Sequence, residues 1–344
     1  MDDPHGPYER KVQLTGGTTY TVSLPKAWAN EQGLDTGSLV HLYTRGDRLL
    51  VTQPDADASR RTVSLSASRY DPSRIGRAVA AAYVAGADTV HVTDAPGREA
   101  CAAVRDAVAG LVGIEVATES DGEVVARTML DVADLSPKQT LAQMQGMALS
   151  MHEEAIEAAL SGDEEEGRRI AGQDDTVDRL FGLVAREFQQ SLVDVRIDGA
   201  GDGLTTFDYY TVARQIERVG DHAEKIAGTA ALIDAEPPAD LAADIARVAG
   251  DARAVVADAV AAALGDRDPD ALGRAVADGE RVVEATAALD RRLYEQDLAN
   301  GYPLATVLDS VGRTAEYGIN VAEAGLQASL RRADADPMTP ANAE

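Results

Sequence analysis

The C-terminal half of the chain contains the same helical pattern twice, and this repeat limits the folds that are open to the sequence. A helix that reads RIAGQDDTVDRLFGLVAREFQQSL near residues 170–190 returns 106 residues later as RAVADGERVVEATAALDRRLYEQDL. The next helix, TVARQIERVGDHAEKIA, returns 99 residues later as SVGRTAEYGINVAEAGL, and an opening helix precedes each pair. We therefore expect a six-helix domain over residues 135–332, built from repeats at 135–235 and 238–332.

Apolar residues in these helices recur at alternating steps of four and three, which is typical of helices that pack against one another. In the third helix the row consists of Val212, Ile216, Val219, Ala223, Ile226, Ala230 and Ile233. Two antiparallel three-helix bundles are the simplest way to bury such rows. The pattern therefore predicts a pair of three-helix bundles.

Two smaller units are expected before the repeat. Residues 8–54 alternate short strands with Gly-Gly and Gly-Asp turns around one helix, which Pro25 opens and Gly33 closes. Residues 60–130 follow the order strand, helix, strand, helix, strand, strand, which predicts a small α/β domain of unassigned role. Residues 333–344 are typical of a disordered tail. The predicted fold is multi-domain and mainly α.

The composition indicates in which cellular compartment the protein is expected. No apolar run approaches the length of a membrane span, and the first residues lack the apolar segment of a secretion signal. A single cysteine, Cys101, excludes an internal disulfide framework and a cysteine-based zinc site. We therefore expect a cytoplasmic protein without membrane insertion.

The chain is strongly acidic, with a net charge of −26 from 58 acidic and 32 basic residues. Abundant Asp and Glu with only four lysines is typical of a halophile, in which high salt screens the repulsion. The alternative is an acidic protein that binds cations or basic partners. Residues 1–54 hold six acids and five bases, so this segment is nearly neutral and is a candidate surface for a polyanion.

Acidic residues interrupt the apolar row of the second helix in both copies. Asp174 stands between Ile170 and Val177, and Glu280 stands between Val276 and Val283. A carboxylate at an inward position costs several kcal/mol unless it is paired or binds a cation. In each copy a second acid follows one turn later, at Asp178 and Glu284.

The third helix adds a carboxylate stripe in each copy, and oxygen-only clusters suit hard cations such as Mg, Ca, Mn or ferric iron. Asn320 replaces one acid of the second stripe. The alternative is ion pairing with Arg179, Arg214 and Arg218. The candidate metal ligands are Asp174, Asp178, Glu217, Asp221, Glu224, Glu280, Glu284, Glu316 and Glu323.

Enzyme activity is not expected. The sequence contains no plausible pair of nucleophile and base, and it lacks the Glu-x-x-His pairs of a ferritin-like oxidase. His222 follows Asp221 and is either a further ligand or a surface residue, whereas His152 is interpreted as structural.

The segment RQIERVGDHAEKIA (214–227), with DDTVD (174–178) on the preceding helix, resembles the signature of PhoU proteins. The resemblance covers about residues 135–332 and implies a pseudo-symmetric six-helix fold. It also implies metal clusters on (Glu/Asp)-x-x-x-Asp motifs, at Asp174/Asp178 and Glu217/Asp221 and at their second-copy counterparts. PhoU proteins restrain phosphate uptake through a transporter and its signalling kinase.

The segment RKVQLTGGTTYTVSLPKAWANEQGLDTGSLVHLYTRGDRLLV is similar to the AbrB/SpoVT/MazE family, through Ser23-Leu24-Pro25-Lys26 and the Gly33-Leu34 and Gly37-Ser38 pairs. This resemblance implies an interlaced homodimer whose swapped hairpins contact DNA. The alternative is a module used for dimerisation alone. The implied DNA contacts are Arg10, Lys11, Thr15, Gly16, Thr18 and Lys26.

These observations predict a DNA-binding transcriptional regulator of phosphate uptake and homeostasis, with a metal-bearing sensor domain to which inorganic phosphate is an indirect ligand. The alternative is an adaptor that inhibits a phosphate-transporter ATPase or a sensor kinase by protein contact. An antitoxin is disfavoured because most of the chain would then lack a purpose.

Overall fold

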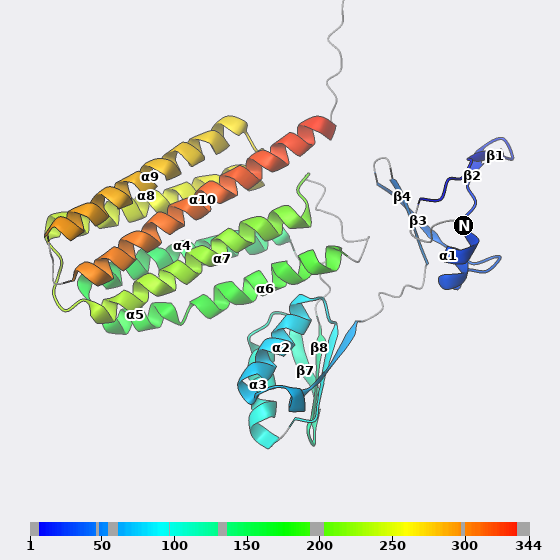
Figure 1. Cartoon of the computed structure of the whole chain (residues 1–344), viewed down its shortest axis with the longest axis horizontal. Coiled ribbons are helices and arrows are strands. Elements are labelled where there is room, and N and C mark those ends of the chain that lie inside the picture. Colours follow the sequence, from blue (N-terminus) through cyan, green and yellow to red (C-terminus); the bar gives the residue numbers. More distant parts are fainter. Residues whose placement is uncertain are drawn as a thin grey trace, which may run out of the picture. The chain divides into compact units, whose positions relative to one another are not determined.

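The computed structural model describes residues 7–45, 48–53, 61–95, 97–129, 136–192, 203–296 and 300–335. The chain divides into two compact units, Met1–Ser59 and Arg60–Glu344 (Figure 1). Among the helices described, none is long and apolar enough to cross a membrane. The last helix continues to Ala335, so the expectation of a disordered tail is wrong for residues 333–335, and residues 336–344 lie outside the described part.

The first unit consists of two antiparallel hairpins and a short helix. Strand β1 (Gln13–Thr15) pairs with β2 (Thr19–Thr21), and β3 (His41–Arg45) pairs with β4 (Arg48–Thr52). Helix α1 (Lys26–Glu31) follows Pro25 and precedes Gly33, whose φ of 65° closes it. Gly16 and Gly17 have φ of 64° and 80°, which the tight turn between β1 and β2 requires.

Burial in this unit is incomplete. Val12, Leu14, Tyr20 and Leu39 keep 66%, 59%, 76% and 78% of their surface exposed. Among the described residues of the unit whose side chains are placed, none is fully buried. A pair of short strands is marginally stable by itself in water. Within its described residues, one copy of this unit therefore has no hydrophobic core of its own.

A small mixed sheet with two helices begins the second unit, in the strand and helix order expected from the sequence. Its strands are β5 (Thr62–Ser66), β6 (Thr89–Thr93), β7 (Ile114–Ser120) and β8 (Glu123–Thr128), which lie in the order β5-β6-β8-β7. Strands β5 and β6 are parallel, and the other neighbours are antiparallel. Helices α2 (Pro72–Val84) and α3 (Gly97–Ala109), together with the short 3-10 turn η1 (Ala67–Arg69), complete this domain.

Alternate residues of the sheet are apolar because one face packs against the two helices. Val90 and Val124 are fully buried on this face, beneath Val79 and Tyr83 of α2 and Val104 of α3. The buried residues form a hydrophobic core that is separate from the core of the remaining helices.

The remaining described residues of the second unit are mainly helical. The first repeat contains α4 (Pro137–Ser161), α5 (Glu164–Ala171), α6 (Asp174–Ser191) and α7 (Thr206–Thr229), followed by the 3-10 turn η3 (Ala230–Leu232). The second repeat contains α8 (Ala239–Leu264), α9 (Pro269–Gln296) and α10 (Gly301–Ala335). The expected second helix of the first repeat is broken at Gly172 and Gln173, whereas its counterpart α9 is continuous.

The helix ends follow from local sequence. Ser136 accepts a hydrogen bond from the backbone N–H of Gln139, and Pro137 occupies the first turn of α4. Thr205 and Asp208 form a reciprocal capping box at the start of α7. The predicted apolar row of α7 is confirmed, because Val212 and Ile216 are among its buried residues. The two repeats share one continuous core, and α7 packs against α10 between them.

Arg186 of α6 links the helical domain to the mixed-sheet domain. Its side chain is 1% exposed, and its Nη1 donates to the backbone oxygens of Tyr83 (2.8 Å) and Ala87 (2.6 Å). Its Nη2 donates to Oδ1 of Asp88 at 2.7 Å, and its guanidinium lies 4.9 Å from the ring centroid of Tyr83. A buried guanidinium is tolerated here because Asp88 pairs with its charge and both Nη atoms donate to these acceptors, whereas its Nε has no partner within the described residues.

Replacement of Arg186 should therefore destabilise the second unit. We expect Arg186→Ala to lower the free energy of unfolding by about 3 kcal/mol, because the change removes the ion pair with Asp88 and the hydrogen bonds to the carbonyl groups of Tyr83 and Ala87. Urea denaturation of the full chain measures this effect. Arg179→Ala, an exposed change on the same helix, is the control and should change stability by less than about 0.5 kcal/mol. Equal stability of the two variants would contradict the assigned role of Arg186.

Candidate metal centre

Three carboxylates meet where the start of α6 lies against α7. One oxygen each from Asp174, Asp178 and Asp221 lies within 4.8 Å of the other two. Asp174 is the first residue of α6, so its carboxylate also lies at the positive end of the helix dipole. The break after α5 therefore places the most buried acid of the cluster where a helix terminus partly compensates its charge.

A glycine makes room for this acid. A Cβ atom at Gly220 would lie 2.8 Å from Oδ1 of Asp174 and 3.5 Å from Cγ1 of Val177. A glycine in a helix interior costs about 1 kcal/mol relative to alanine. Gly220 is thus a residue of the site that the sequence reasoning missed, although an interior helical glycine beside Asp221 was the available signal.

The cluster is short of counter-charge. Asp174 as a residue is only 8% exposed. Its Oδ1 atom and Oε2 of Glu217 are buried and have no hydrogen-bond partner within the described part of the chain. Of the three arginines considered as partners, Arg214 approaches Glu217 at 3.5 Å. Arg218 lies over the ring of Tyr317 instead, 5.9 Å from its centroid. Ion pairing with arginines therefore leaves most of this negative charge uncompensated.

Burial and mutual repulsion raise the proton affinity of the cluster. Desolvation, followed by the charges of Asp178 and Asp221, raises the pKa of Asp174 to about 7. Desolvation and the charge of Asp221 raise the pKa of Glu217 to about 7, and Asp178 has a raised pKa for the same two reasons. A cation would relieve both desolvation and repulsion, and an all-oxygen ligand set fits a hard cation such as Mg, Ca, Mn or Fe.

The two remaining candidates of the first repeat lie beside this cluster. Glu217 is half-buried one turn before Asp221, and Glu224 is exposed one turn after it. The charge of Glu224 contributes to the raised pKa of both Asp174 and Asp178. The structure therefore brings all five acids of the first repeat into one neighbourhood.

The expected register of the second repeat is wrong by one residue. Tyr294, expected in the inward row of α9, is 89% exposed, and Glu280 is exposed as well. The buried residues of α9 are Leu272, Ala275, Gly279, Val282, Thr286, Leu289 and Leu293. A shift of 105 residues superimposes the buried residues Ile170, Val177 and Val184 on the buried residues Ala275, Val282 and Leu289, so the counterpart of Asp174 is Gly279.

The acids of the second repeat are not gathered in the same way. Glu280, Glu284 and Glu323 are exposed, and Glu316 accepts a hydrogen bond from Arg313 at 2.7 Å. The Asn320 amide donates to Oε1 of Gln215 at 3.0 Å. Within the described residues, the structure does not unite these four acids into a group of three ligands.

The histidines near the cluster take part in packing. Nε2 of His222 lies 3.1 Å from the hydroxyl oxygen of Tyr317 on α10. Desolvation, followed by the charge of Lys225, lowers the pKa of His222. His152 on α4 is fully buried, and desolvation with the charge of Arg253 lowers its pKa to about 3, so its ring is neutral. The interpretation of His152 as structural agrees with this burial.

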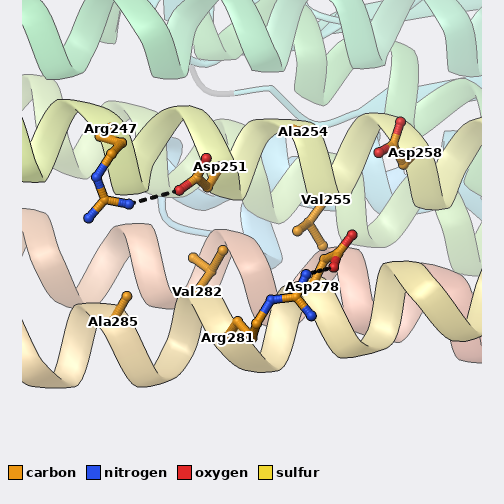
Figure 2. A pocket seen from close by; sticks show the side chains of 9 residues that line it. All are labelled: Arg247, Asp251, Ala254, Val255, Asp258, Asp278, Arg281, Val282 and Ala285. Atoms are coloured by element: carbon orange, nitrogen blue, oxygen red, sulfur yellow. Dashed lines mark hydrogen bonds and ion pairs between the residues drawn. The ribbon is translucent and has the colours of Figure 1, made fainter.

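A groove of about 400 Å³ lies elsewhere, between α8 and α9 (Figure 2). Its floor includes Val255 and Val282, and its rim is charged. Arg247 donates to Asp251 at 3.2 Å, and Arg281 donates to Asp278, so the rim cations are already paired. This groove has neither the orphaned oxygens nor the crowded carboxylates of the α6–α7 cluster.

The predicted DNA-contacting residues lie in the first unit and are all exposed. Thr15, Gly16 and Thr18 surround the β1–β2 turn, where the Oγ1 atoms of Thr15 and Thr21 are 3.1 Å apart. The Arg10 guanidinium lies 5.5 Å from the ring centroid of Tyr8. The remaining candidates, Lys11 and Lys26, are exposed as well.

Comparisons with known proteins agree with this architecture. The PhoU domain model matches residues 141–230, and the model of the antidote-toxin recognition MazE family of bacterial antitoxins matches residues 13–57. No curated protein matches the chain in sequence.

Two solved structures are similar in fold. PhoU from Pseudomonas aeruginosa is 16% identical, with a TM-score of 0.50 over 57% of this chain and 96% of that one. The phosphate transport system regulatory protein PhoU from Streptococcus pneumoniae is 17% identical, with a TM-score of 0.49 over 56% of this chain and 93% of that one. The chain is thus similar to PhoU domains over residues 141–230 and to MazE-type antitoxins over residues 13–57.

Proposed function

We propose that the protein is a dimeric, DNA-binding regulator of phosphate uptake whose PhoU domain binds metal at the α6–α7 cluster. The observation that carries the proposal is a cluster of under-compensated carboxylates in the PhoU domain of a chain that also has a MazE/AbrB-type domain. The first unit would select the promoter, and the helical domain would respond to phosphate.

Dimerisation is supported by the missing core of the first unit. Leu14, Val22 and Leu24 expose 59%, 51% and 41% of their surface in a single copy, close to the hairpin that carries the candidate DNA contacts. Burial of such side chains against a second copy gains roughly 25 cal/mol for each Å² of apolar surface removed from water. A second copy of this chain is the partner whose hairpins would complete that core.

DNA contact is supported by the distribution of charge. Residues 1–54 have a net charge near −1, whereas the remaining 290 residues carry about −25. The phosphate backbone of DNA would be repelled by the strongly acidic part of the chain and tolerated by the nearly neutral part. Arg10, Lys11 and Lys26 provide exposed cations there, and Thr15 and Thr18 provide hydroxyl groups for contacts that do not depend on charge.

In the helical domain, Asp174, Asp178, Glu217, Asp221 and Glu224 would hold the metal. Bound cations with open coordination positions would give inorganic phosphate an indirect site on an otherwise acidic surface. Asp174 would bind the cations from the buried side of the cluster. Gly220 leaves room for its carboxylate, because any larger side chain there would contact Oδ1 of Asp174. The more exposed acids, Asp178, Asp221 and Glu224, would close the site toward solvent.

An adaptor is the second candidate function. Five basic residues are few for a DNA-binding surface, and this count favours a first unit that only dimerises. In that case the PhoU domain would act by contact with a phosphate-transporter ATPase or a sensor kinase. The two functions differ in whether the purified protein recognises DNA.

The space left by Gly220 provides a test of the metal centre. We expect Gly220→Ala to weaken Mn²⁺ binding at least about tenfold, because the new Cβ displaces the Asp174 carboxylate. Isothermal titration calorimetry of the full chain measures the affinity. Gly228→Ala is the matched control on the same helix, since a Cβ there meets no atom within 4 Å. Equal Mn²⁺ affinity of the two variants would contradict the proposed role of Gly220.

DNA recognition can be tested with a duplex from the promoter of phosphate-transporter genes. We expect specific binding that weakens with salt, and Arg10→Ala should reduce the slope of log K against log salt by about 0.9 if one phosphate contact is lost. Arg74→Ala, an exposed change on α2, should leave both affinity and slope unchanged. Failure of the wild-type protein to bind, or identical binding by Arg10→Ala, would favour the adaptor.

A further inference from the structure

We infer that the chain holds metal in its first repeat alone, because in the second repeat an isoleucine fills the place of the buried carboxylate. This inference rests on the metal centre proposed above and concerns its number per chain. Its basis is the packing between α9 and α10, compared position by position with the packing between α6 and α7.

The contacts of Gly220 and Gly279 identify which residues correspond between the two repeats. In the first repeat, a Cβ at Gly220 of α7 would meet Oδ1 of Asp174 on α6 at 2.8 Å. The counterpart of Gly220 on α10 is Ile319, and this side chain packs on Gly279 of α9, where a Cβ would lie 2.5 Å from Cγ1 of Ile319. The contact and the burial pattern of α9 agree on Gly279 as the counterpart of Asp174.

The large and the small side chain of this contact therefore stand on opposite helices in the two repeats. In the first repeat the acid Asp174 on the second helix faces Gly220 on the third. In the second repeat Gly279 on the second helix faces the hydrocarbon side chain of Ile319 on the third. A Cβ at Gly279 would also lie 3.3 Å from Cγ1 of Val255, so the space is closed by apolar atoms. The three atoms nearest to this position are all apolar, so among the described residues no buried carboxylate stands here in place of Asp174.

Most of the other ligand positions have also lost their carboxylates or have them paired in the second repeat. At the shift of 105 residues, the counterpart of Asp178 is Val283, which packs against the hydrophobic core. Asn320 replaces Asp221, and its amide is hydrogen-bonded to Gln215. Glu316 keeps the position of Glu217 but pairs with Arg313 at 2.7 Å. The second repeat thus retains two of five carboxylates, and a guanidinium already compensates one of them.

The backbone differs as well. Asp174 begins a helix, because α5 ends at Ala171 and α6 starts two residues after Gly172. Gly279 lies in the interior of α9, where the preceding turn satisfies the backbone N–H groups. The helix-terminal field that favours a carboxylate at Asp174 is therefore missing at its counterpart. Packing, ligand chemistry and helix breaks agree in assigning metal to one repeat.

Transfer of the second-repeat packing into the first repeat tests the inference. In the double variant Asp174→Gly with Gly220→Ile, we expect complete loss of Mn²⁺ binding, with helix content and melting temperature retained. The probe is Mn²⁺ titrated into the full chain, with free Mn²⁺ counted by electron paramagnetic resonance. Glu280→Gln with Glu284→Gln is the matched control, and we expect its Mn²⁺ stoichiometry and affinity to equal those of the wild type. Loss of any class of Mn²⁺ site in this control would overturn the inference.

The reverse transfer keeps the test decisive if the first double variant does not fold. Gly279→Asp, Val283→Asp, Ile319→Gly and Asn320→Asp together rebuild the ligand set and its space in the second repeat. We expect this variant to gain a second class of Mn²⁺ site, and an unchanged stoichiometry would overturn the inference. Wild-type protein without any Mn²⁺ binding would instead refute the proposed metal centre, and this result is distinct from a wild type with sites in both repeats.

Discussion

The carboxylate of Asp174 is a buried charge that the surrounding helices must accommodate, because one of its oxygens has no partner among the described residues. Several features of the surrounding structure accommodate it. The chain breaks between α5 and α6, so that this acid begins a helix, and α7 carries a glycine opposite it. The nearby acids Asp178 and Asp221 add to its charge rather than compensate it. Such an arrangement is stable only together with a proton or a cation.

The duplicated architecture confines the buried, under-compensated carboxylate to one of the two repeats. The two repeats share one hydrophobic core, and α7 packs on α10 along the contact between them. In the second repeat the corresponding helices meet through Gly279 and Ile319, with Thr286 beside Gly312 further along the same contact. These contacts contain no buried carboxylate. A duplicated fold can therefore keep a chemically costly site in one copy while the other copy contributes packing alone.

Much of this fold was predictable from the sequence. The repeat, the apolar row of α7 and the strand and helix order of the middle domain were all predicted, and the carboxylates of the first repeat lie together as their spacing suggested. The register of α9 was not predictable from apolar spacing, because Val276, Val283 and Tyr294 form an equally regular row one residue from the buried one. In an alanine-rich helix such neighbouring rows differ little in hydrophobicity. The position of Gly279 against Ile319 depends on contacts between helices, which a periodicity within one helix does not record.

The bonds of Arg186 have a mechanical consequence. Asp174 and Arg186 lie on the same helix, about 18 Å apart at 1.5 Å per residue. Two of the three acceptors of Arg186 are backbone carbonyls at the end of α2 and just beyond it, and these cannot follow a moving guanidinium as a flexible side chain would. A rotation or axial shift of α6 must therefore carry the mixed-sheet domain with it or break these bonds. For small displacements, the helix that bears the buried acid and the neighbouring sheet therefore move together as one rigid body.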